Sequence, residues 1–365
     1  MSARFKSLRN RYFLVPLIAL ILMLLSWSAS LANPYLAILG GVLVAAVFTA
    51  VHHAEVVALK VGEPFGSLIL ALAVTVIEVG MIVVLILGAP EANQSLARDT
   101  VFAAIMITTN GIVGISLLIK TLRQRVAIFN ASGVSGALAA LVALSTLCLV
   151  LPTVTISTPG PTFNDVQLIF AALVSLGLYL TFVMAQTVRH RDYFLPPPRE
   201  DQTIPIEEHV EPPTKTQAWQ SVAGLLVSLI AVVGLAKVTS PLIQGVVDDL
   251  GLPKMMIAIS IAIVVLLPES ISAVKAARYG RTQTSLNLAY GSALASIGLT
   301  IPVIAIFSLF SNYEFNLGLS SAEIVLMALT FLVSTLTVIS GRATLLQSVI
   351  HLSIFGSFLM FAATP

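Results

Sequence analysis

The chain has 365 residues, of which 57% are hydrophobic and only 10% are charged. This composition excludes a soluble globular domain, in which about 25% of residues are charged, and is typical of a polytopic membrane protein. The net charge of +2 gives no indication of a nucleic-acid partner, and we expect none. The single cysteine, Cys148, excludes a disulfide framework and a thiolate metal site.

Basic residues precede the first apolar run, Tyr12–Trp27, and small residues follow it at Ser28–Asn33. This pattern leaves a cleaved signal peptide as an alternative. We favour a retained helix, because it places the basic N-terminus on the same side as most other basic residues of the chain. Residues 1–33 are therefore predicted to form an extra N-terminal transmembrane helix.

Runs of about 20 apolar residues predict membrane-spanning helices, and about eleven such runs follow one another along the chain. They lie at Tyr12–Ser30, Pro34–Leu59, Phe65–Leu87, Thr100–Ile119, Val134–Ile156, Val166–Val188, Trp219–Val238, Lys254–Ala276, Leu286–Phe310, Ala322–Ile339 and Thr344–Phe361. The stretch Pro241–Asp249 either extends the seventh helix past a proline kink or lies at the membrane surface. We expect an all-α polytopic membrane protein.

Basic residues between these helices indicate the orientation of the chain. With a cytoplasmic N-terminus, only Arg98, Lys237 and Lys254 fall outside. The other basic residues after the first helix all fall on the cytoplasmic side, namely Lys60, Lys120, Arg123, Arg125, Arg189, Arg191, Arg199, Lys215, Lys275, Arg278, Arg281 and Arg342. This asymmetry is a strong positive-inside signal and supports the number of helices.

A polar interval at residues 189–217 is rich in proline and acidic residues. It lacks the apolar side chains that a packed core needs, so we predict a disordered cytoplasmic linker. The linker separates two sets of five helices, residues 34–188 and 218–365. The helix with Glu78 then crosses from inside to outside and the helix with Glu269 crosses in the opposite direction, as in inverted-repeat transporters.

Each half carries one carboxylate deep in an apolar run: Glu78 in Gly62–Leu87 and Glu269 in Pro253–Lys275. Placing a charged side chain at that depth costs about 2.5–3.5 kcal/mol on insertion scales. Carboxylates inside membranes are functional by default, and the alternative is a protonated structural acid that is hydrogen-bonded to a neighbouring helix. The matched places in the two halves favour a shared site for cations and protons.

Oxygen-bearing side chains accompany both carboxylates. Thr75 lies one turn before Glu78 on the same helix face. The helices that follow the two glutamate helices carry Asn110, Ser292 and Ser296. Pro268 leaves a backbone carbonyl near Val264 without its helical donor, which adds an oxygen beside Glu269. Hard cations take such oxygen ligands, although small polar residues in membrane helices are more often packing contacts.

His52, His53 and Glu55 stand near the cytoplasmic end of the second predicted helix, where His52 and Glu55 share a face. We weigh two interpretations, a pH-responsive gate and an interfacial ion pair. Glu63, just before the Glu78 helix, is a further candidate for the gate or stabilises the N-terminus of that helix. His351 in the last helix is interpreted as a satisfied buried polar group.

Two stretches, His52–Val79 and Leu266–Pro302, resemble the corresponding repeats of ChaA-type calcium (sodium/potassium)/proton antiporters. These form a bacterial branch of the calcium/cation antiporter superfamily and are related to calcium/proton exchangers. The resemblance extends over nearly the whole chain and implies export of cytoplasmic Ca²⁺, and in this branch also of Na⁺ or K⁺, in exchange for external protons. It also implies a bacterial inner-membrane location, with cation binding by Glu78 and Glu269 and matching polar residues at Asn110, Ser292 and Ser296.

One departure from calcium/proton exchangers bears on the transported ion. Those proteins usually carry Gly-Asn shortly before each glutamate, whereas this chain reads Val74-Thr75 and Val265-Leu266. The missing amide leaves a Na⁺- or K⁺-selective proton antiporter with little Ca²⁺ transport as an alternative.

Our hypothesis is cation/proton antiport by alternating access, in which the two carboxylates hold either protons or a cation. A cation channel is a rival, but one acid in each half makes a poor ring of ligands. An enzyme is a second rival, and the chain shows no zinc-binding HExxH pattern. We expect a transporter rather than an enzyme, with no cofactor. Its partners are inorganic cations, protons and the lipid bilayer, and the sequence leaves open whether it forms a homo-oligomer.

Overall fold

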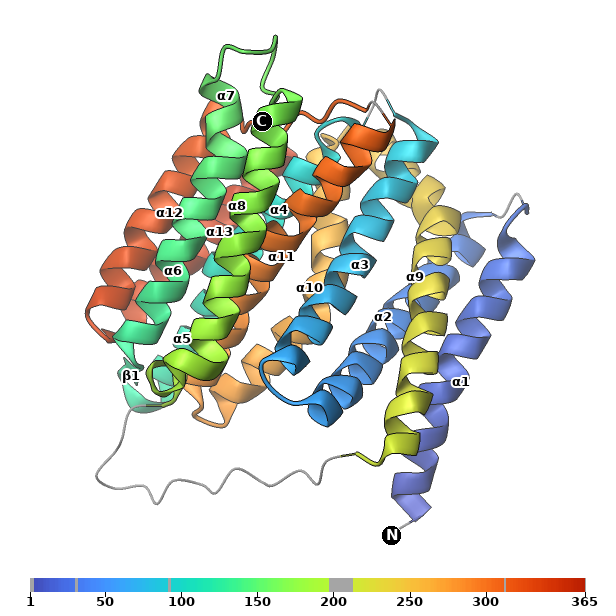
Figure 1. Cartoon of the computed structure of the whole chain (residues 1–365), viewed down its shortest axis with the longest axis horizontal. Helices are drawn as coiled ribbons and strands as arrows, with labels where there is room; N and C mark the ends of the chain where they lie inside the picture. The colour runs from blue at the N-terminus through green and yellow to red at the C-terminus, as the bar shows by residue number, and fades with distance from the viewer. Residues whose placement is uncertain (1–2, 30–31, 91–92, 197–212, 312, 365) are drawn as a thin grey trace.

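The computed structural model describes residues 3–29, 32–90, 93–196, 213–311 and 313–364, with residues 3–11 as backbone only. Most of the predicted linker, residues 197–212, lies outside this description. Long helices run up and down across the molecule (Figure 1). We refer to the face that carries the N-terminus as the N-terminal face and to the opposite one as the C-terminal face.

The helices follow the predicted spans closely. They are α1 (Ala3–Ser26), α2 (Asn33–Val61), α3 (Phe65–Gly88), α4 (Leu96–Met106), α5 (Val113–Gln124), α6 (Ala131–Ser145), α7 (Leu151–Val154), α8 (Asp165–Met184), α9 (Lys215–Asp249), α10 (Met255–Arg278), α11 (Thr282–Ser311), α12 (Ser321–Ile339) and α13 (Leu345–Ala363). Shorter elements are the π-helical η2 (Ile107–Ile112), η3 (Thr146–Val150) and η4 (Ala185–Arg189), the 3₁₀ turn η5 (Arg191–Phe194), and the strands β1 (Ala127–Ile128) and β2 (Arg342–Ala343).

Ten helical rods of the described chain are long and apolar enough to cross a membrane, and Tyr12–Ser26 in α1 forms a shorter apolar helix. The prediction of an all-α polytopic membrane protein with about eleven helices is therefore confirmed. The structure also decides between the two alternatives for the stretch Pro241–Asp249. Helix α9 continues through Pro241 to Asp249, so this stretch extends the seventh helix.

Local sequence explains where several helices begin. Capping boxes start α8, α9, α12 and α13, in which a Ser, Thr or Asn at the N-cap exchanges hydrogen bonds with a Gln or Glu three residues later. Asn164 with Gln167 and Ser320 with Glu323 are examples. These pairs satisfy amide groups that the first helical turn leaves without partners.

The two glutamate helices pack crosswise on the opposite parts of the chain. Helix α3 lies against α11, which follows α10, while α10 lies against α4 and α5, which follow α3. On the other flank, α1, α2 and α9 form a group of three (Figure 1). This exchange of neighbours is the arrangement that two inverted repeats would produce. The division of the chain into repeats at residues 34–188 and 218–365 stays a prediction.

Short contacts join the two parts of the chain at the N-terminal face. Strands β1 and β2 pair in an antiparallel fashion. Nearby, the Arg123 guanidinium donates to the carbonyl of Arg278 over 2.9 Å, and Lys120 Nζ approaches the carbonyl of Gly280 at 3.4 Å. Positive side chains at the C-terminal end of a helix are favourable, so α5 stabilises the end of α10.

Candidate functional site

Glu78 lies at the contact between α3 and α11. Its side chain is buried, and its Oε1 accepts a hydrogen bond of 2.7 Å from the hydroxyl of Ser296. The residues are 218 positions apart in the chain. The bond joins two of the residues that the sequence predicted as cation ligands, one from α11 and one from α3.

A second hydroxyl lies beside Glu78. Thr300 follows Ser296 by one turn on α11 and is fully buried next to the Glu78 carboxyl group. Its Oγ1 has no hydrogen-bond partner among the described residues. Hydroxyl oxygens are among the ligands that hard cations take, so Thr300 would offer an oxygen to a cation held at Glu78.

Glu269 of α10 is the second predicted carboxylate. Its Oε2 is buried and has no hydrogen-bond partner among the described residues. Among the described residues, the carboxyl groups of Glu55 and Glu78 lie near enough to disfavour a negative charge on it. A buried carboxylate oxygen without a donor and with negative neighbours is unfavourable unless a proton or a cation joins it, so this arrangement suits either occupant.

The remaining predicted ligands of this site lie on the same two helices. Thr75 is buried one turn before Glu78, and Ser292 is half-buried one turn before Ser296. Pro268 lies within the continuous helix α10 and cannot donate to the carbonyl of Val264, in line with the prediction. The site therefore offers two carboxylates with hydroxyl and carbonyl oxygens.

Asn110 belongs to a different set of contacts. It lies in the π-helical segment η2, and its Nδ2 donates to Thr330 Oγ1 over 2.9 Å. Its Oδ1 lies 3.1 Å from His351 Nδ1, and His351 Nε2 lies 3.2 Å from Thr337 Oγ1. The structure thus directs Asn110 toward α12 and α13 rather than toward Glu78, and it shows His351 as a satisfied polar group.

The hydrogen bonds of this network fix its protonation pattern. The Thr330 hydroxyl donates to the carbonyl of Leu326, so it can only accept from the amide of Asn110. The Asn110 oxygen then faces His351, which must carry a hydrogen on Nδ1, and the Thr337 hydroxyl donates to Nε2 when the imidazole is neutral. The pattern is consistent throughout with a neutral imidazole.

The residues predicted as a gate each make different contacts. His52 stacks on Tyr12 of α1, with ring centroids 3.7 Å apart. Glu55 is exposed and lies close enough to Glu269 to act on its charge. Glu63 accepts a 2.5 Å hydrogen bond from Ser67 in the first turn of α3, which supports its interpretation as a group that stabilises that N-terminus.

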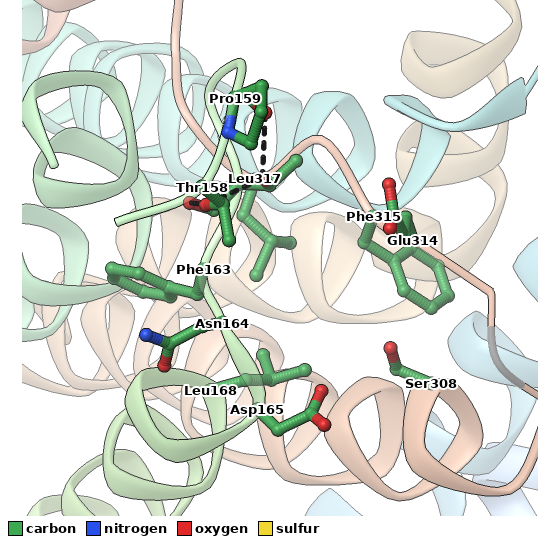
Figure 2. A pocket seen from close by; sticks show the side chains of 11 residues that line it. Thr158, Pro159, Phe163, Asn164, Asp165, Leu168, Ser308, Glu314, Phe315 and Leu317 are labelled. Carbon is green, nitrogen blue, oxygen red and sulfur yellow. Dashed lines mark hydrogen bonds between the residues drawn. The ribbon is translucent and has the colours of Figure 1, made fainter. Parts of the chain in front are cut away.

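A pocket of about 250 Å³ lies away from the two glutamates, near the C-terminal face. Figure 2 shows it between the loop at Thr158–Asn164, the start of α8 and the segment that contains Glu314 and Phe315. Asp165 and Glu314 both line it. None of the predicted site residues borders this pocket.

Within the described ranges, no three His, Cys, Asp or Glu side chains come together as a metal site. A cation at Glu78 and Glu269 would therefore complete its shell with hydroxyl, carbonyl or water oxygens, as hard cations do. Thr300, Thr330 and Thr337 were missed in the sequence. The signal for Thr300 was its place one turn beyond Ser296, but hydroxyl residues are too common in membrane helices for that spacing to decide.

Comparisons with known proteins extend over nearly the whole chain. A family model described as sodium/calcium exchanger protein matches residues 31–188 and 220–364. The chain is 45% identical over 325 residues to the putative ionic transporter y4hA of Sinorhizobium fredii, which covers 89% of this chain and 87% of the relative. It is 31% identical over 351 residues to the sodium-potassium/proton antiporter ChaA of Escherichia coli, with 94% of each chain covered.

The fold is also that of a solved exchanger. The structure is similar to a crystal structure of the H⁺/Ca²⁺ exchanger CAX, with a TM-score of 0.74 at 14% sequence identity. The match covers 99% of this chain and 90% of the other. At this identity the likeness concerns the arrangement of the helices.

Proposed function

The chain belongs to the sodium/calcium exchanger family, and on this premise we propose that it exports cytoplasmic cations in exchange for protons by alternating access. Family membership confirms the resemblance that the sequence indicated and shows a multi-pass membrane transporter of the calcium/cation antiporter superfamily rather than an enzyme. Exchangers of this family move ions without a cofactor. A bacterial inner membrane and a cytoplasmic N-terminus belong to the proposal, supported by the distribution of basic residues.

The observation that carries the proposal is the pairing of the two intramembrane glutamates. Glu78 is held by Ser296, whereas Glu269 has a buried oxygen without a partner. The charge of Glu78 also disfavours a second negative charge on Glu269. Removal from water favours the protonated form of a carboxyl group and a bound cation favours its charged form. Protons and a cation therefore compete for one site, and this competition is the coupling.

We assign export of Ca²⁺, with Na⁺ or K⁺ as further substrates, because two carboxylates match the charge of one divalent cation. One Ca²⁺ would replace two protons, whereas Na⁺ or K⁺ needs to replace only one. A monovalent-selective antiporter is the second candidate. It is favoured by the absence of an asparagine before each glutamate and by the similarity to ChaA, a sodium-potassium/proton antiporter.

Everted membrane vesicles with an imposed pH gradient test the proposal. Addition of Ca²⁺, Na⁺ or K⁺ in turn should dissipate the gradient for each transported ion. Glu78→Gln and Glu269→Gln should each abolish the response, because the amide cannot exchange a proton for a cation. Glu323→Gln is a matched control, since that acid caps α12 outside the site. Exchange by either glutamine variant at the wild-type rate would refute the assignment.

A further inference from the structure

Helix α1 contains a proline whose effect is visible in a neighbouring helix. Pro16 lies inside α1 and has no N–H, so the carbonyl four residues earlier, that of Tyr12, has no donor from its own helix. His53 of α2 lies there, with its Nε2 3.0 Å from the Tyr12 oxygen. Because a carbonyl can only accept, the imidazole must carry its hydrogen on Nε2.

The ring of His53 occupies the junction of three helices. It contacts α1 through Tyr12, and on α9 it lies so close to Gly224 that a Cβ there would come within 2.5 Å of Nε2. The other ring nitrogen, Nδ1, is buried without a hydrogen-bond partner among the described residues. Next to it, His52 stacks on the ring of Tyr12. The N-terminal half of α1 is thus bound to α2 by a specific hydrogen bond and a stacked pair.

The other end of α1 is bound to α9. Met23 packs where α9 has Gly234, and any Cβ at that position would overlap the Met23 side chain. Trp27 follows the last residue of α1, and the Nζ of Lys237 on α9 lies 4.0 Å from the centroid of its ring. A cation above an aromatic face is attractive, and the glycine allows close approach of the two helices.

We propose that α1 is a brace that holds α2 and α9 in one lengthwise register, with His53 as the residue that latches it. Helix α1 packs against both partners, and its two attachments, at Tyr12 and Met23, are separated by about 16 Å along its axis. A helix is stiff along its axis, so α2 cannot shift lengthwise against α9 without breaking one attachment.

A double-mutant cycle between Pro16 and His53 tests the latch on the purified full-length protein. His53→Phe keeps a ring but removes the donor, and it should lower the melting temperature by about 2–4 °C. Pro16→Ala restores the donor within α1, so the same substitution should cost at most half as much in that background. An equal loss in both backgrounds would overturn the proposal, because His53 would then act through packing alone.

Two further variants keep the test decisive if the phenylalanine protein does not fold. His53→Gln places an amide N–H near the position of Nε2 and should retain the wild-type melting temperature, whereas the shorter His53→Asn should not. Equal melting temperatures for these two variants would contradict the latch. These measurements do not depend on which ion is transported.

A reversible cross-link tests the brace itself. Met23→Cys with Gly234→Cys, in a Cys148→Ala background, joins α1 to α9 at their closest approach. If α1 and α9 keep one register, oxidation should leave the rate of cation/proton exchange within about twofold of the reduced protein. Loss of exchange on oxidation that reduction restores would show that α1 slides along α9, and it would overturn the brace.

Discussion

The hydroxyl of Ser296 on α11 donates a 2.7 Å hydrogen bond to Oε1 of Glu78 on α3. Ser296→Ala removes this donor and leaves the buried carboxylate without it. Hydrogen bonds to charged groups contribute about 1.5–3 kcal/mol, so the half-saturating cation concentration should change by about tenfold or more. Cation-dependent proton flux in vesicles measures it. Ser311→Ala, at the exposed end of the same helix, is the control and should behave as wild type.

The Thr300→Val variant tests whether the Thr300 hydroxyl binds the cation or has only a structural role. Thr300→Val keeps the shape of the side chain and removes only the hydroxyl beside Glu78, so the melting temperature should change little. The same substitution should raise the half-saturating cation concentration, because an oxygen next to Glu78 is lost. A variant that melts earlier and transports normally would show that the hydroxyl serves packing rather than the cation.

The pH dependence of cation affinity follows from competition at Glu78 and Glu269. Protons and the cation exclude each other, so the half-saturating concentration should rise as pH falls. The slope is up to about tenfold per pH unit if one proton is displaced, and up to about 100-fold if two are displaced. Flux titrations with Ca²⁺ and with Na⁺ therefore read the number of protons exchanged for each ion. A half-saturating concentration that is constant from pH 6 to pH 9 would contradict a shared site.

The ion pair of Arg98 and Asp99 supports the C-terminal face. The two side chains approach to 2.6 Å, and Arg98 also donates to the carbonyl of Gly318 over 2.7 Å. Arg98→Gln leaves Asp99 buried without its partner and should destabilise the protein by about 3–5 kcal/mol. Thermal melting measures the loss.

The double variant of this pair provides the internal check. Arg98→Gln with Asp99→Asn removes both charges, so it should be more stable than Arg98→Gln alone. Lys60→Gln, which removes an exposed charge at the end of α2, should change the melting temperature little. Strictly additive losses from the two members of the pair would show that Arg98 and Asp99 do not interact energetically.

Hydrophobicity alone determined the helices of this protein. Each apolar run of about 20 residues became a helix, because backbone groups in a bilayer must be satisfied within the segment. The capping pairs, such as Asn164 with Gln167, marked several starts from local sequence. The two glutamates could be singled out from the same apolar runs. A carboxylate inside such a run, as at Glu78, costs free energy and is therefore expected to have a function.

Tertiary structure alone decided which side chains meet. The sequence offered Asn110 and Ser296 as equal partners for the carboxylates, yet Ser296 reached Glu78 and Asn110 turned to His351. Helical periodicity gives the face of a residue only within its own helix, whereas contacts between helices depend on how the rods rotate and cross. The bond from His53 to the carbonyl freed by Pro16 shows the same limit, because the sequence reveals the missing donor but not the helix that supplies it.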